Sequence, residues 1–193
     1  MRFRNVAIVL GLFVLGLFVQ PLFASNLVGA LLVRAENGDD EAMLSLGIAY
    51  ELGGYGVSQN MDEAIKWYRK SANLGNANGQ AFLGTCYLEG KGVAKDYVEA
   101  VKWYTKSADQ GQNIGLYSLG ICYQFGFGVS KDMGKAVKLF ATSALNGDAL
   151  AQVKMGSLFL GLNKPDEAVK WYKMAAKQGN EEAKRVLKQI SER

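Results

Sequence analysis

The stretch that decides the fold runs from Leu83 to Gly111 and reads LGTCYLEGKGVAKDYVEAVKWYTKSADQG. The same order of features recurs about every 36 residues along the chain: Leu-Gly-x-x-Tyr, a glycine turn, Ala-x-x-Trp-Tyr and Ala-x-x-Gly. Self-similarity with a fixed period of this length is typical of units that each form one helix pair and stack on their neighbours. The sequence therefore predicts an all-α protein, an α/α solenoid of antiparallel helix pairs.

The block occurs in three full copies and one shortened copy. Its Leu-Gly-x-x-Tyr motif begins at Leu46, Leu83 and Leu119, and a variant of it begins at Met155. In the fourth copy, the stretch from Gly161 to Pro165 replaces the glycine turn and is four residues shorter. Because Pro165 suits the first turn of a helix, we expect a tightened hairpin at this point.

These motifs resemble the Sel-one-like repeat, a relative of the tetratricopeptide repeat, over roughly residues 35–180. The resemblance implies a right-handed superhelix of antiparallel helix pairs that acts as a protein-binding scaffold and has no chemistry of its own. It places four repeats in residues 39–180, at about 39–76, 77–112, 113–148 and 149–180. Residues 181–193 then form a C-terminal capping helix.

Particular residues within each block predict how its two helices begin, end and meet. A glycine in the middle of each first helix costs about 1 kcal/mol relative to alanine, so we expect close helix contact to offset that cost. These glycines are Gly47, Gly84, Gly120 and Gly156. The Gly-x-Gly turns, Gly54 and Gly56 in the first copy, should supply positive φ angles. Asn60, Asp96 and Asp132 are predicted N-caps, and Glu63 and Glu99 would complete capping boxes.

The N-terminus has the features of a secretory signal peptide. Arg2 and Arg4 precede an apolar run over residues 6–19, and Ala24 offers a small residue for cleavage. We expect residues 1–24 to be removed and no membrane insertion afterwards; an uncleaved anchor is the alternative. Residues 25–38 would remain as a capping helix, because Ala35-x-x-Gly38 matches the end of the later second helices. The chain has no Asn-x-Ser/Thr sequon, so we expect a bacterial protein that is periplasmic or secreted.

Composition argues against several classes of function. The chain contains no histidine, which excludes Ser-His or Cys-His couples and histidine metal sites, so we expect no enzyme, no metal and no cofactor. The formal net charge of +4 falls to about +2 without the leader, which is no signature of nucleic-acid binding. Cys86 and Cys122 hold the same position in successive repeats. Equivalent points in stacked helix pairs lie about 9–10 Å apart, too far for a disulfide, so we expect free buried thiols.

By analogy with tetratricopeptide grooves, one face of the first helices is the candidate partner-binding surface. The positions expected on its concave side, several of them apolar, are Leu44, Ile48, Leu52, Ala81, Thr85, Leu88, Tyr117, Ile121, Phe125, Val153 and Ser157. Tyr117, Ile121 and Phe125 together would form an aromatic-aliphatic patch of the kind that binding hot spots favour. Alternatively, these residues pack against neighbouring first helices. Phe127, at a turn tip, is a weaker candidate.

Charge separates the two helix types. The second helices carry most of the lysines, whereas the first helices of repeats one to three carry no Lys or Arg, so the convex side should be basic. Anionic lipid or envelope polymers would suit such a face; a solvated lysine surface is the simpler interpretation. The sequence therefore predicts a monomeric, non-enzymatic adaptor of the bacterial envelope that binds a protein partner. The alternative is a secreted factor acting on a protein of a host or neighbouring cell.

Overall fold

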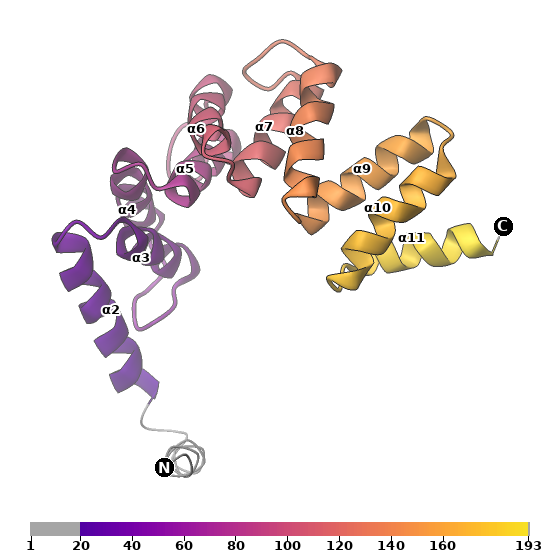
Figure 1. Cartoon of the computed structure of the whole chain (residues 1–193). Coiled ribbons are helices and arrows are strands. Elements are labelled where there is room, and N and C mark those ends of the chain that lie inside the picture. Colours follow the sequence, from indigo (N-terminus) through magenta and orange to yellow (C-terminus); the bar gives the residue numbers. More distant parts are fainter. Residues whose placement is uncertain (1–19, 193) are drawn as a thin grey trace, which may run out of the picture. The chain divides into compact units, whose positions relative to one another are not determined.

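The computed structural model describes residues 20–192, with side chains from Leu27 onward, and this part of the chain is entirely helical (Figure 1). Its ten helices are α2 (Gln20–Glu36), α3 (Asp40–Leu52), α4 (Met61–Asn73), α5 (Ala77–Glu89), α6 (Tyr97–Asp109), α7 (Asn113–Phe125), α8 (Met133–Leu145), α9 (Ala149–Gly161), α10 (Pro165–Lys177) and α11 (Glu181–Ser191). Helices α2 to α4 belong to one compact unit, and α5 to α11 belong to a second. Most of the expected signal peptide, residues 1–19, lies outside the described residues.

The predicted solenoid of helix pairs is confirmed. Each repeat forms one hairpin of two helices with 13 residues each: α3 with α4, α5 with α6, α7 with α8, and α9 with α10. In the fourth repeat, only residues 162–164 join the helices, whereas residues 126–132 do so in the third. Pro165 occupies the first turn of α10, so the tightened hairpin is also confirmed.

The mid-helix glycine of each first helix lies against an aromatic ring of its partner helix. A Cβ atom added at Gly84 would approach the Tyr104 ring to 2.9 Å, and one at Gly120 would approach Phe140 to 2.6 Å. Gly47 meets Tyr68 and Gly156 meets Tyr172 in the same way. All four rings are almost fully buried. The expected reason for these glycines, close helix contact, is therefore confirmed, with a specific ring as the contact.

In three of the hairpins, a buried serine of the second helix is hydrogen-bonded to the first residue of the first helix. The hydroxyl of Ser107 donates to the carbonyl of Ala77 at 2.7 Å, at the first residue of α5. The Ser71 hydroxyl donates to the backbone carbonyl of Asp40 in repeat one, and the Ser143 hydroxyl donates to the backbone carbonyl of Asn113 in repeat three. All three serines are fully buried, so these bonds form away from competing water.

The start of each second helix corrects one sequence-based prediction. Asn60, Asp96 and Asp132 are N-caps as expected, each accepting a bond from the backbone N–H three residues on. The capping boxes are wrong, however. The N–H of Asn60 donates to the carbonyl of Tyr50 at 2.8 Å, and that of Asp96 donates to Tyr87, so neither needs a glutamate. Glu63 and Glu99 instead pair with Lys66 and Lys102 one turn further along the helix.

The turn of repeat one also differs from expectation. Gly90 and Gly126 end their helices in the left-handed conformation, but in repeat one Gly53 does so, and not Gly54. The loop of repeat one is one residue longer, and Tyr55 adopts a positive φ of 59°. The extra residue therefore shifts the position of the helix end by one place.

Helix α2 has the geometry of a second helix, as its closing motif predicts. The N–H of Gly38 donates to the carbonyl of Ala35, and Gly38 has a φ of 87°. The same bond and a positive φ recur where α4, α6, α8 and α10 end, at Gly75, Gly111, Gly147 and Gly179. Helix α2 packs on α3 through Val28 and Leu31. Its described part, Gln20–Glu36, includes residues that precede the expected start of the capping helix at residue 25.

Candidate protein-binding surface

The predicted partner-binding residues fall into buried and exposed groups. Leu44 and Val153 are 6% and 7% exposed and belong to the protein interior, which leaves little of either side chain for a partner. Ile48, Thr85, Leu88, Tyr117 and Ile121 are half-buried. Leu52 and Phe125 are exposed at 72% and 49%, and each lies at the end of its helix. Within this set, Leu52 and Phe125 therefore present the most apolar surface to solvent.

The half-buried members of the set contact their own hairpins. The hydroxyl of Thr85 lies 3.0 Å from the Tyr104 hydroxyl and also donates to the carbonyl of Ala81. Ile121 holds the same position in repeat three and packs against the cluster that contains Phe140. An apolar contact therefore replaces the hydroxyl pair of repeat two. Ser157 and Tyr172 restore the polar pair in repeat four at 2.9 Å. At Thr85, Ile121 and Ser157, the side chain is therefore polar where the buried aromatic residue of the repeat is tyrosine and apolar where it is phenylalanine.

Tyr117 and Phe125 take part in different clusters. The Tyr117 ring is tilted against Phe140 at a centroid distance of 5.5 Å and joins the core between α7 and α8. Phe125 stacks on Phe127 at 5.7 Å, and Phe127 stacks on Tyr97 at 4.9 Å. We call these three residues, Tyr97, Phe125 and Phe127, the aromatic stack. Phe127, the weaker candidate by sequence, is its central member, and sequence reasoning missed Tyr97.

Two smaller features accompany the other candidates. Ile48 lines a shallow recess of about 210 Å³ in the first unit, together with Leu27, Leu31, Ser45 and Tyr55. Leu88 contacts the buried cluster of Ala100, Tyr104, Leu119 and Cys122 in the second unit. Both residues therefore combine packing with partial exposure.

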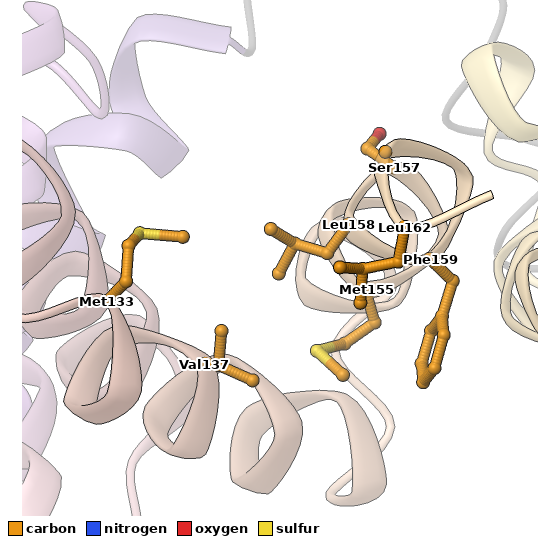
Figure 2. Close-up of a pocket in the computed structure, with 8 residues that line it drawn as sticks. Met133, Val137, Met155, Ser157, Leu158, Phe159 and Leu162 are labelled. Carbon is orange, nitrogen blue, oxygen red and sulfur yellow. The ribbon is translucent and has the colours of Figure 1, made fainter. Parts of the chain in front are cut away.

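An apolar cavity of about 340 Å³ lies between α8 and α9 (Figure 2). Met133 and Val137 of α8 face Leu158 of α9 across it, and Leu162 lies at the short turn after α9. Met155, Ser157, Phe159 and Gly161 complete the lining. We call this feature the α8–α9 cavity. Sequence reasoning did not anticipate it, although the missing glycine turn of repeat four marks its position.

Five lysines of the second helices form ion pairs or ring contacts close to their own position in the sequence. Lys66, Lys102 and Lys135 form ion pairs with the acidic residue three positions earlier, with more than half of each lysine side chain exposed. Lys70 and Lys106 lie over the rings of Trp67 and Trp103, about 4 Å from the ring centres. Such ion pairs contribute little to stability, because both partners are exposed to solvent. The arrangement favours a solvated basic surface over a dedicated anion site.

The described residues provide no metal-binding cluster, and one of their cysteine thiols has a raised pKa. No group of three or more Cys, Asp or Glu side chains between residues 20 and 192 is placed to hold a metal ion. Cys86 and Cys122 are both buried and are not joined in a disulfide, and burial raises the pKa of the Cys122 thiol to about 11. A thiol with such a pKa is a poor nucleophile at neutral pH, because the thiolate is the reactive form. In the same part of the chain, no helix has both the length and the apolar character required to span a bilayer.

Comparison with solved structures places these hairpins among known repeat proteins. A Sel1 repeat protein from Oxalobacter formigenes is 34% identical, with a TM-score of 0.79 over 86% of this chain and 69% of that one. The protein c5321 of uropathogenic Escherichia coli, described as a protective antigen with an SLR fold, is 35% identical with a TM-score of 0.70. That match covers 84% of this chain and 36% of c5321. The solenoid architecture is therefore shared with bacterial proteins of known structure.

Among curated proteins, the rat (Rattus norvegicus) DAP3-binding cell death enhancer 1 is 47% identical over 53 residues. This match covers 28% of the present chain and 10% of the rat protein, so the chain spans about a tenth of that relative's length. A family model described as Sel1 repeat matches residues 40–76, 77–112, 114–148 and 149–180. These four matches coincide with the four hairpins, and the chain belongs to the Sel1 repeat family.

Proposed function

We propose that this protein is an exported, non-enzymatic adaptor that binds a protein partner through the aromatic stack. Sel1 repeats are protein-interaction modules, and proteins built from them are generally non-catalytic scaffolds. The observation that carries the proposal is Phe125, which is 49% exposed although it lies in ring contact with Phe127. About half of this apolar side chain is exposed to solvent, so a partner protein could bury it on binding.

The aromatic stack has the properties that binding hot spots share. Its rings come from the first turn of α6, the last residue of α7 and the turn that follows α7. Gly126 and Gly128, with φ angles of 79° and 68°, shape this turn. Because the turn and the stacking already restrict the rings, binding would cost less side-chain entropy than it does for a mobile loop. Aromatic anchors in such preorganised settings contribute most to protein–protein affinity.

Export is the second part of the proposal. The basic residues, apolar run and small residue of positions 2–24 have the order of a signal peptide. The bacterial origin of the two solved relatives described above is compatible with a periplasmic or secreted adaptor. The rat relative is named for binding DAP3, which supports protein binding as the kind of function but does not identify the partner of this chain.

The test is a crosslinked pull-down of the full chain, tagged at its C-terminus, from periplasm, membrane and culture supernatant. Phe125→Gln should abolish recovery of the partner. Leu145→Gln is the matched control, because Leu145 is also an exposed last residue of a helix but lies outside the stack. Equal recovery with both variants would overturn the assignment of the surface, and retention of the protein in the cytoplasm would overturn export. Accumulation in the supernatant without an envelope partner would favour the secreted factor.

A further inference from the structure

The loop that joins the two helices of repeat three has a packing role in the preceding repeat. Phe127 and Val129 of this loop pack on the buried cluster at the junction of α6 and α7, formed by Ala100, Tyr104, Leu119 and Cys122. The Phe127 ring stacks on Tyr97, the first residue of α6. Gly128 lies so close to the Tyr97 carbonyl that any side chain there would clash with it. An aromatic residue, a glycine and an aliphatic residue thus cover the start of α6.

The corresponding junction of α8 and α9 lacks this cover. Met133 is the first residue of α8, as Tyr97 is of α6, and Val137 corresponds to Val101. The loop of repeat four has only three residues, and none of them belongs to the cluster around Ala136, Phe140 and Met155. Met133 remains 46% exposed. The α8–α9 cavity therefore lies where repeat three would predict a covering loop.

We infer that the α8–α9 cavity binds an aromatic–glycine–aliphatic segment of the partner protein, which takes the place of the absent loop. This inference rests on the proposed function, because it requires a protein ligand. The chain itself shows the chemistry of the occupant: Phe127 supplies the ring, Gly128 permits the close backbone approach, and Val129 fills the remaining apolar surface. The cavity volume of about 340 Å³ is at the small end of the range for ligand sites, which suits one or two side chains.

The wall chemistry agrees with such an occupant. Seven of the eight lining residues are apolar or glycine, and only Ser157 carries a polar side chain. The Ser157 hydroxyl is already bonded to the Tyr172 hydroxyl. The lining therefore offers no charged group to fix a carboxylate or a phosphate, and apolar contact is its means of recognition.

The probe for the first test is the synthetic peptide QFGFGVSK, which has the sequence of residues 124–131. Titrated into the full-length protein carrying ¹³C-methyl methionine and valine, it should shift the methyl signals of Met133 and Val137, with a dissociation constant on the order of 1 mM. The matched control is QFGKGVSK, which has the lysine that repeat two carries at this place, Lys91. We expect it to bind about tenfold more weakly or not at all, because the ring is the main apolar group.

Two variants of the protein make the site assignment falsifiable. Met133→Glu should abolish the peptide-induced shifts while preserving the fold, because an acidic residue is favourable in the first turn of a helix. Replacing residues 162–164 with the loop sequence GFGVSKD should fill the cavity from within, which blocks the peptide and raises Tm. Leu145→Gln, at an exposed residue of α8 that does not line the cavity, should bind the peptide as the wild type does.

The inference would be overturned by the absence of methyl shifts up to millimolar peptide, by equal shifts with both peptides, or by peptide binding that survives Met133→Glu or the loop replacement. Sedimentation of the wild type and Met133→Glu at increasing concentration tests a second copy as occupant. Self-association that Met133→Glu abolishes would assign the cavity to a copy of this chain and overturn a separate partner. Because these measurements need no natural partner, they can fail while the pull-down succeeds, and the reverse also holds.

Discussion

Two glycines of α9, five residues apart, should respond in opposite directions to substitution by alanine. A Cβ at Gly156 would lie 2.8–2.9 Å from three carbons of the Tyr172 ring, closer than real Cβ contacts. The ring is 2% exposed, and its hydroxyl is bonded to Ser157, so it has little freedom to move away. Overpacking of this kind costs about 1–3 kcal/mol, and the higher helix propensity of alanine returns about 1 kcal/mol. We expect Gly156→Ala to lose roughly 1 kcal/mol of stability.

Gly161→Ala is the matched control in the same helix. A Cβ at Gly161 meets no atom within 4 Å, and its φ is not positive, so alanine gains up to about 1 kcal/mol from helix propensity. The resulting gap of about 2 kcal/mol corresponds to roughly 4–8 °C in Tm for a chain of this size. Thermal unfolding followed by circular dichroism measures this gap directly.

A double-mutant cycle identifies the ring as the cause. Tyr172→Leu removes the ring atoms that the new methyl group would meet, so Gly156→Ala should cost less in that background, with a coupling of about 1 kcal/mol. Two results would refute the reasoning: Gly156→Ala at least as stable as the wild type, or an additive cycle. Either would mean that the glycine is present for a reason other than its contact with Tyr172.

Three further predictions concern other buried groups. Ser107→Ala removes the 2.7 Å bond to the Ala77 carbonyl and should cost about 1 kcal/mol in urea unfolding, whereas an unchanged midpoint would contradict a stabilising bond. Burial raises the pKa of Tyr104 to about 12. Since the unfolded chain releases this proton near pH 10, the free energy of unfolding should fall by about 2–3 kcal/mol between pH 10 and 12, and Tyr104→Phe should lack that component. Burial also raises the pKa of Cys122, so a thiol reagent should modify it at pH 8 only at the rate of unfolding; a fast reaction would refute its burial.

The fold was predictable because each repeat carries local sequence signals, such as N-caps and helix-ending glycines, that mark where its helices begin and end. Caps such as Asp96 and the helix-ending Gly111 act within a few residues, and their repetition identifies them as structural. The capping boxes failed for a tertiary reason. The N–H of Asp96 donates to the carbonyl of Tyr87, near the end of the first helix, so it is not available to the Glu99 side chain. The sequence pattern of the second helix does not show that the first helix supplies this acceptor.

The candidate surface was only partly predictable, because exposure depends on what each turn covers. Periodicity placed Tyr117, Ile121 and Phe125 on one helix face. It did not show that the Tyr117 ring packs in the core whereas the Phe125 ring stacks on a residue of the turn. The left-handed Gly126 reverses the chain between Phe125 and Phe127 and allows their rings to stack. Tyr97 joins them from another helix, and that contact has no signature in the sequence around it.

The short loop of repeat four shows why a departure from a repeat can be more informative than the repeat itself. Deleting four residues keeps the hairpin, since Asn163 takes a φ of 56° and Pro165 starts α10 at once. What the deletion removes is a contact with the preceding helix pair, and the larger side chain of Leu158, at the position of Cys122, does not fill that space. A loop that had only a connecting role could be shortened without consequence. Because the loop of repeat three also covers the preceding helix pair, the shorter loop of repeat four leaves the apolar α8–α9 cavity open, and there we propose that a segment of the same sequence type binds.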